Sequence, residues 1–255
     1  MPDFHRSAAA KMSTENSLHK QFLALLALGL FCAVPAVLSA NSKDVISKTV
    51  ACAKYQFHYL LYAPPRSTAS PAIVILHGAG DQPDPMLEAW KSLAKKEGIV
   101  LIAPQLPRVA AFEELAPQVF RCMVEDARKT ILLDPLRIYI FGNSMGGYLG
   151  YDAAMLQSNY FAAAAVHAMG ISEDYYWIVG RAERKTPVAI YIGDGDSPDL
   201  FDKARKTRDL LRKDNFPVHY VELRGHDHNY YALSDHINED AWNFLKDKKL
   251  PNLQP

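Results

Sequence analysis

The sequence lacks any net charge. Lysine and arginine together number 28, and aspartate and glutamate also number 28, so the formal net charge at pH 7 is zero. A chain with no excess of either sign has no field that would hold nucleic acid or an anionic membrane surface. We therefore expect no nucleic-acid partner, and a neutral small molecule or a polymer is the more suitable substrate.

Long apolar runs are also scarce, and the longest lies near the N-terminus at residues 22–40. This run follows Lys20 and ends in small residues, which is the pattern of a secretory signal peptide. A transmembrane anchor is the alternative, since the run approaches a spanning length, but Pro35 and the small residues after it favour cleavage. We predict a signal peptide over residues 1–40, with Met12 as an alternative start. A secreted or periplasmic protein without a stable membrane anchor follows.

Cysteine is rare, with three residues in the chain, and Cys32 falls within the apolar run. Cys52 and Cys122 would remain after export, in a compartment where disulfides persist. One bridge between them and two buried free thiols both fit the sequence. The choice depends on whether their Cα atoms lie within about 7 Å of each other.

Internal repeats, low-complexity tracts and long linkers are absent from the sequence. Short β-branched apolar runs alternate instead with longer amphipathic stretches, which predicts a mostly parallel sheet covered by helices in one domain over residues 41–255. The expected strands lie near residues 50–62, 72–76, 99–103, 138–141, 162–167, 188–192 and 218–223. The expected helices lie near residues 85–96, 115–132, 144–156, 200–213 and 230–246.

The strongest local signal is the pentapeptide GNSMG at residues 142–146, which follows a buried apolar run and precedes a helical stretch. This is the context of a nucleophile elbow, a sharp turn whose glycines let the strand and the helix approach closely. The hydroxyl of Ser144 would then point into a cleft at a helix N-terminus, where the dipole favours negative charge. Ser144 is therefore the predicted nucleophile.

A second apolar run, at residues 73–76, ends in the glycine-rich turn HGAGD. Acyl transfer needs two backbone N–H groups aimed at the oxyanion, one directly after the nucleophile and one from an earlier strand-to-helix turn. Met145 and Ala79 are the candidates. We expect His77, at the strand end beside the glycines, to shape this turn rather than to act in catalysis.

The acid of a catalytic triad should follow a later strand, and the run at residues 188–192 leads to three aspartates. We select Asp196, because three residues beyond the strand leave the loop room to turn its carboxylate toward a histidine. Asp194 is the alternative, and Asp199 is expected to cap the next helix. Asp-Gly is also a common turn pair, so a purely structural role fits all three.

The base should come last, and two histidines, His226 and His228, follow the final strand. A histidine in this position can take a proton from the serine. The His-x-His pattern also resembles part of a metal site, but no further ligands stand at diagnostic spacing. We therefore expect no metal and leave both histidines as candidate bases at this point.

Several of these segments resemble the esterase branch of the α/β-hydrolases: HGAG at residues 77–80, the run from Asp134 to Gly147, and GDGD at 193–196. The strand and elbow look like those of secreted polyhydroxybutyrate depolymerases and feruloyl esterases. The turn LHGAGD is similar to that of acyl-protein thioesterases and carboxylesterases. The resemblance implies the α/β-hydrolase fold, with helices on both faces of the sheet and a small or absent cap.

The closing segment, GHDHNYY at residues 225–231 with DHI at 235–237, resembles S-formylglutathione hydrolases, whose matching histidine falls on His228. Other members place the histidine directly after a glycine, which would select His226. The longer match favours His228. The resemblance implies hydrolysis of carboxylic esters by Ser144, His228 and Asp196 through an acyl-enzyme, without a cofactor.

A short insert follows the strand at residues 162–167, where this fold often carries a variable cap. It contains Tyr175, Tyr176 and Trp177, which either stack on a bulky substrate or pack against the sheet. Two other functions fit the chain less well. A peptidase of this fold usually carries a gating domain, for which residues 41–255 leave no room, and a non-catalytic binding protein would not need all three triad residue types in order.

Overall fold

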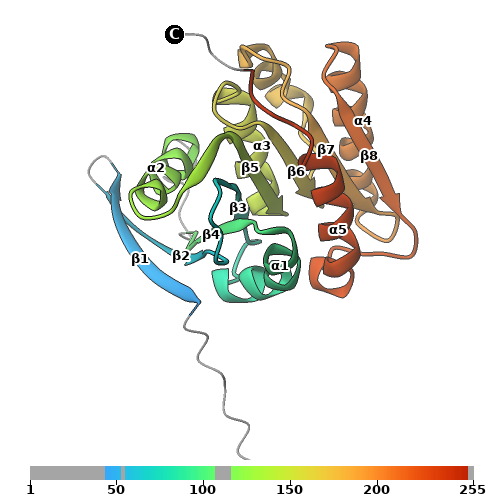
Figure 1. The fold of residues 1–255 in the computed structure, drawn as a ribbon. Coiled ribbons are helices and arrows are strands. Elements are labelled where there is room, and N and C mark those ends of the chain that lie inside the picture. The colour runs from blue at the N-terminus through green and yellow to red at the C-terminus, as the bar shows by residue number, and fades with distance from the viewer. Residues whose placement is uncertain (1–43, 53–54, 107–115, 252–255) are drawn as a thin grey trace, which may run out of the picture. The chain divides into compact units, whose positions relative to one another are not determined.

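The computed structural model describes residues 44–52, 55–106 and 116–251, so the predicted signal peptide lies outside the described residues. Eight strands form one sheet in the order β1-β2-β4-β3-β5-β6-β7-β8 (Figure 1). The strands are β1 (Val45–Cys52), β2 (Tyr55–Tyr62), β3 (Ser70–Leu76), β4 (Val100–Pro104), β5 (Leu133–Asn143), β6 (Ala163–His167), β7 (Val188–Gly193) and β8 (Val218–Leu223).

Six of the strands, from β4 to β8 in spatial order, run parallel to one another. Every residue of β3, β4, β6 and β7 is buried, as expected of apolar runs that helices cover on both faces. Because the strands are parallel, their carboxyl ends meet at one edge of the sheet. The loops predicted to carry the catalytic residues all leave from that edge.

Helices cover both faces of the sheet (Figure 1). They are α1 (Pro83–Glu97), α2 (Ala116–Arg128), α3 (Met145–Leu156), α4 (Pro198–Lys213) and α5 (Ser234–Leu245), with 3-10 helices η2 (Glu173–Arg181) and η3 (Tyr230–Ala232). Buried side chains of α1 and α5 share one apolar cluster, and those of α2, α3 and α4 share the other. The alternation of apolar runs and amphipathic stretches thus predicted the layers.

The first expected strand is wrong in one respect, because residues 50–62 do not form a single strand. β1 pairs antiparallel with β2, from Val45 opposite Tyr62 to Cys52 opposite Tyr55, so the chain reverses direction inside the expected strand. The two residues between these strands are alanine and lysine. Neither is a residue typical of hairpin turns, so the sequence carries no signal for the reversal.

The last expected helix also differs, since residues 230–246 form a 3-10 turn and then a separate helix. Leu233, between η3 and α5, has φ −129° and ψ 20°, which is not helical. The expected helix at residues 115–132 ends instead at Arg128, before the chain enters β5. Boundaries of this kind depend on tertiary packing more than on periodicity.

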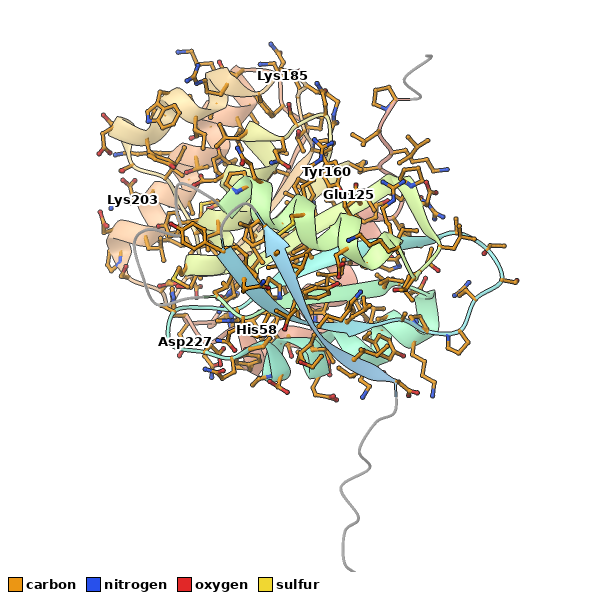
Figure 2. All side chains as sticks on the ribbon, turned by 90° about the vertical axis from the view of Figure 1, so that its left-hand side faces the viewer. His58, Glu125, Tyr160, Lys185, Lys203 and Asp227 are labelled. Atoms are coloured by element: carbon orange, nitrogen blue, oxygen red, sulfur yellow. A yellow bond between two sulfur atoms is a disulfide. The ribbon has the colours of Figure 1, made fainter. Side chains whose placement is uncertain are left out.

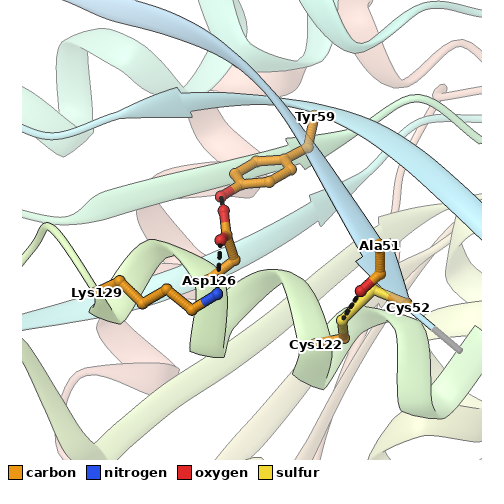
Figure 3. Close-up of a disulfide and its surroundings, with 6 residues drawn as sticks. All are labelled: Ala51, Cys52, Tyr59, Cys122, Asp126 and Lys129. Carbon is orange, nitrogen blue, oxygen red and sulfur yellow. Dashed lines mark hydrogen bonds and ion pairs between the residues drawn. A yellow bond between two sulfur atoms is a disulfide. The ribbon is translucent and has the colours of Figure 1, made fainter.

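Cys52 and Cys122 form a disulfide, with their Cα atoms 6.1 Å apart (Figure 3). The bond ties the edge strand β1 to α2. A polar contact lies beside it, where the Tyr59 hydroxyl donates to Asp126 at 2.7 Å. Burial opposes ionisation of this carboxyl, but hydrogen bonds from Lys48, Tyr59 and Lys129 lower the pKa of Asp126 to about 2. The sequence alone had left the state of the two cysteines open.

Candidate active site

Ser144 lies in the sharp turn between β5 and α3, with φ 52° and ψ −117°. This is a strained conformation for a residue with a side chain, and such strain is common at nucleophiles. A Cβ on Gly142 would lie 2.0 Å from the carbonyl oxygen of Gly146, and one on Gly146 would lie 2.4 Å from that of Leu76. The two glycines are therefore required by close backbone approach, as the motif predicted.

The hydroxyl of Ser144 is hydrogen-bonded to a histidine from the loop after β8. Its Oγ lies 2.8 Å from Nε2 of His228. Nδ1 of the same ring lies 3.0 and 3.1 Å from the two carboxylate oxygens of Asp196. The His228 side chain is half exposed, whereas that of Asp196 is 5% exposed. The three residues thus form a continuous Ser-His-Asp chain of hydrogen bonds, in the order needed for nucleophile, base and acid.

The three aspartates after β7 have separate contacts. Asp196 faces His228, whereas Asp194 accepts a hydrogen bond from the backbone N–H of Gly225 at 2.6 Å. The expectation that Asp199 caps the next helix is wrong, because Ser197 is the N-cap of α4 and its hydroxyl accepts from the N–H of Leu200. Asp199 lies in the first turn of α4, where it pairs with Lys203.

The alternative base, His226, does not contact Ser144 in any hydrogen bond among the described residues. Its side chain is buried, and its Nε2 lies 3.0 Å from Nε2 of His167, the last residue of β6. Burial lowers the pKa of His226, although Asp227 and Asp196 oppose this shift. The buried ring of His226 thus faces His167, whereas that of His228 faces the nucleophile.

His77 has the structural contacts that the sequence analysis expected. Its ring is buried, with Nδ1 2.8 Å from the carbonyl oxygen of Gly78 and Nε2 3.1 Å from the backbone N of Leu106. Since a carbonyl only accepts, Nδ1 carries the proton and Nε2 accepts from Leu106. The ring joins the turn after β3 to the chain after β4.

Two cavities adjoin the nucleophile turn. The larger, of about 460 Å³, is lined by Gly78, Ala79, Gly80, Asp81, Asn143, Ser144, His228, Asn229, Tyr230 and Tyr231. The smaller, of about 130 Å³, is lined by Ala79, Gly80, Asp81, Gln82, Gln105, Leu106 and Met145. Ala79, Gly80 and Asp81 border both cavities. Asp81 is fixed there by hydrogen bonds from the Tyr231 hydroxyl and from the backbone N of Gln82.

The two predicted oxyanion-hole residues lie beside Ser144. Met145 is the first residue of α3, so its N–H has no acceptor within the helix. The N-terminus of the helix also carries a partial positive charge. Ala79 lies in the turn that follows β3 and borders the same cavity as Met145. The arrangement can supply hydrogen-bond donors next to the serine.

The three aromatic residues proposed to recognise substrate lie in η2, and none is among the described residues that line either cavity. Tyr175 donates to Asp152 of α3, and its ring makes an edge contact with that of Trp177. Tyr175 and Tyr176 pack against the buried cluster under α2, α3 and α4. Trp177 is 53% exposed. The packing alternative therefore describes the two tyrosines.

Two residues next to the nucleophile, Asn143 and His167, were not predicted from the sequence. Nδ1 of His167 lies 2.8 Å from Oδ1 of Asn143, and the carbonyl of His167 accepts from the N–H of Ser144 at 2.9 Å. Both side chains are buried. The available signal was a histidine closing an otherwise apolar strand at the edge where the catalytic loops meet.

Within the described ranges, no group of three or more histidine, cysteine, aspartate or glutamate side chains is arranged to hold a metal ion. Within the same ranges, no helix combines the length and apolar character needed to cross a membrane.

Comparison with protein-family models finds no match, and comparison with curated proteins finds none either. Solved structures do resemble the chain. An S-formylglutathione hydrolase from Staphylococcus aureus has a TM-score of 0.67 at 16% identity, over 79% of this chain and 95% of that one. A thermostable esterase has a TM-score of 0.65 at 21% identity, over 81% of this chain and 63% of that one. An acylaminoacyl peptidase from Pyrococcus horikoshii has a TM-score of 0.63 at 15% identity, over 84% of this chain and 43% of that one.

The chain thus spans 63% of the esterase and 43% of the peptidase, but nearly all of the S-formylglutathione hydrolase. At these identities the likeness concerns the fold. The described residues have the α/β-hydrolase fold, with an eight-stranded, mostly parallel sheet and helices on both faces. The fold that the sequence motifs implied is therefore confirmed.

Proposed function

We propose that this protein is a serine hydrolase that cleaves carboxylic esters through an acyl-enzyme. The observation that carries the proposal is the chain of hydrogen bonds from Ser144 Oγ to His228 Nε2 and from His228 Nδ1 to Asp196. Structural likeness to esterases and to other hydrolases agrees with it at the level of fold.

In the first half-reaction, Nε2 of His228 takes the proton of the Ser144 hydroxyl while Oγ attacks the ester carbonyl. The carbonyl oxygen becomes an oxyanion, which the N–H groups of Met145 and Ala79 would stabilise. The imidazolium then gives its proton to the alkoxide leaving group as the bond to it breaks, which leaves the acyl group on Ser144. Asp196 stabilises the charged ring and keeps its Nδ1 protonated.

In the second half-reaction, water takes the place of the alcohol. His228 removes a proton from the water as it attacks the acyl-enzyme carbonyl, and the same ring then returns a proton to Ser144 Oγ. The acid is released and the serine is restored. All groups in this cycle belong to the protein or the substrate, so it balances without a redox partner.

The cavities suggest how an ester would lie. His228 lines the larger cavity, and the leaving group must be near the residue that protonates it. We therefore place the alcohol in the cavity of about 460 Å³ and the acyl group in the cavity of about 130 Å³ beside Met145 and Ala79. The small volume favours short acyl groups over lipid tails, while the larger cavity accepts a bulky or polymer-borne alcohol.

The first test is labelling of the purified protein with a fluorophosphonate, followed by mass spectrometry to locate the adduct. We expect the adduct on Ser144 and no adduct in Ser144→Ala. A folded sample that does not react would overturn the proposal and favour a non-catalytic binding protein. Because the Ser144→Ala change removes a single oxygen, its thermal melting temperature should stay close to that of the wild type.

The second test compares acetyl, butyryl, feruloyl and hydroxybutyrate esters with peptide substrates. We expect hydrolysis of esters, with acetyl and butyryl esters faster than feruloyl esters of the same alcohol. A higher kcat/KM on peptides would replace the esterase assignment with a peptidase. Faster turnover of the feruloyl ester would instead exchange the roles of the two cavities.

We also propose export, because residues 22–40 have the form of a signal peptide. Expression of the whole chain, with fractionation and N-terminal sequencing, tests this. A new N-terminus near residue 41 in the medium or periplasm is the expected result. Retention of the uncut chain in the membrane fraction would favour an anchor.

A further inference from the structure

A buried row of three polar side chains lies beneath the nucleophile turn. The row runs from His226 to His167, with their Nε2 atoms 3.0 Å apart, and from His167 to Asn143, with Nδ1 2.8 Å from Oδ1. His226, His167 and Asn143 are 4%, 0% and 7% exposed as whole residues. None of the steps of the proposed reaction uses them.

The positions of the protons in this row follow from its geometry. Oδ1 of Asn143 is a carbonyl oxygen and can only accept, so Nδ1 of His167 carries a proton. A neutral imidazole has a proton on only one of its two nitrogens, which leaves Nε2 of His167 as an acceptor. The facing Nε2 of His226 must then be the donor. The row is therefore directional, with His226 donating to His167 and His167 donating to Asn143.

A charge on His167 would oppose the hydrogen bond that it accepts from His226. Protonation of His167 would set its Nε2–H against the Nε2–H of His226 at 3.0 Å. Burial, reinforced by His226 and His228, lowers the pKa of His167 to about 3, against the opposing charge of Asp227. The ring of Tyr230, which lies 5.8 Å from that of His167, adds apolar surroundings. His167 therefore stays neutral at neutral and mildly acidic pH.

The backbones of the same residues bind the loops that carry the catalytic groups. The N–H of Ser144 donates to the carbonyl of His167, and the N–H of Gly195 donates to the carbonyl of His226, each at 2.9 Å. A Cβ on Gly193 would lie 2.0 Å from that same carbonyl of His226, so the acid loop and the base loop are in close contact. Gly195 precedes Asp196, and His226 lies two residues before His228.

We propose that His226 and His167 are positioning residues, whose neutral hydrogen-bonded pair fixes the base loop against the nucleophile turn. The pair connects the loop of His228 to Asn143 by side chains, while its backbone carbonyls bind the N–H groups of Ser144 and Gly195. This inference rests on the proposed function for its kinetic consequence, but not for the hydrogen-bonded row itself. It also gives His226 a role distinct from that of the base.

The kinetic test uses two substitutions of His226. Gln can place an amide N–H near the position of Nε2, whereas Phe keeps the ring but removes the donor. With 4-nitrophenyl acetate, His226→Phe should lower kcat by about 10- to 100-fold with KM changed less than about threefold, as expected of a misplaced catalytic group. His226→Gln should restore kcat to within a few-fold of the wild type.

Equal, wild-type kcat in both variants would overturn the proposal, as would equal loss in both. A loss in His226→Phe as large as that in His228→Ala would also overturn it, because the ring would then be needed for chemistry. His58→Gln is the matched control, since His58 lies on β2, away from the nucleophile turn (Figure 2). Its ring is hydrogen-bonded to Thr49 of β1. This variant should retain wild-type kinetics.

A second measurement is independent of activity. ¹⁵N spectra of histidine-labelled protein at pH 7.5 should show His167 with its proton on Nδ1 and His226 with its proton on Nε2, and His167 should still be neutral at pH 5. The opposite tautomers, or a charged His167 at pH 6, would overturn the proposal even if catalysis were normal. A wild-type protein that shows these tautomers but hydrolyses no ester would instead overturn the proposed function. The hydrogen-bonded row itself would still be supported.

Discussion

Nε2 of His228 lies 2.8 Å from Oγ of Ser144, although 84 residues separate the two in the sequence. The contact exists because β5 and β8 are parallel strands of one sheet, so the loops at their carboxyl ends leave from the same edge. Asp196, from the loop after β7, joins them there. The candidate active site is thus a property of the sheet's topology.

The first prediction separates the two candidate acids. If the proposed function holds, Asp196→Asn should lower kcat by about 10⁴-fold, because the amide would favour the wrong tautomer of His228, as it does in known serine triads. Asp194→Asn keeps an oxygen for the N–H of Gly225 and should remain within a few-fold of the wild type. Steady-state kinetics of both variants on one ester measures this. The reverse pattern would assign the acid role to Asp194.

The second prediction concerns the close packing of the nucleophile turn. Gly146→Ala would place a Cβ 2.4 Å from the backbone oxygen of Leu76 and 2.6 Å from that of His77. Because backbone atoms cannot easily move, we expect a loss of about 1–3 kcal/mol in the free energy of unfolding. Gly180→Ala is the control, since no atom lies within 4 Å of its Cβ position, and it should change stability by less than about 0.5 kcal/mol. Urea unfolding of both variants compares them, and equal stability would contradict the packing argument.

The third prediction concerns the disulfide between Cys52 and Cys122, which closes a loop with a sequence separation of 70. The chain-entropy model gives such a loop a stabilisation of about 4 kcal/mol. The double variant Cys52→Ser/Cys122→Ser should lose a large part of this in urea unfolding. Neither cysteine lines either of the two cavities beside Ser144, so kcat at 25 °C should stay close to that of the wild type. A double variant as stable as the oxidised protein would show that the bond adds little.

The fourth prediction concerns acid sensitivity. Burial lowers the pKa of His167 to about 3 from an ordinary value of 6.5, so the unfolded chain binds more protons than the folded one between these values. The contribution of this residue to the free energy of unfolding is fully present above about pH 6.5. Below that pH it declines, by up to about 1.4 kcal/mol per pH unit. The lowered pKa of Asp126 affects the free energy of unfolding mainly below about pH 4, since the ordinary pKa of that carboxyl is 3.8.

Unfolding free energies between pH 6.5 and pH 4.5 test this fourth prediction. The slope of the unfolding free energy against pH should decrease in His167→Gln, because glutamine cannot take up a proton in the unfolded chain. His58→Gln, which changes an exposed histidine on β2, should keep the wild-type slope. The same slope in His167→Gln as in the wild type would show that the buried ring contributes nothing to acid sensitivity.

Much of the fold was predictable because its signals are local. Apolar runs such as residues 72–76 and 188–192 marked strands buried on both faces, and the layers followed from their alternation with amphipathic stretches. The β1–β2 hairpin was missed because its turn has no Gly, Pro, Asn or Asp. The break at Leu233 was missed because periodicity continues across it.

The sequence by itself determined the nucleophile turn, because a strand, a G-x-S-x-G pentapeptide and a helix lie within a short stretch and the glycines meet a steric demand within it. Only the tertiary structure placed His228 rather than His226 beside Ser144, placed Asp196 rather than Asp194 beside His228, and joined the two cysteines in a disulfide. It also brought His167 and Asn143 together beneath Ser144. The physical reason is that these pairs depend on distances between loops from different strands, which local patterns of residues do not encode.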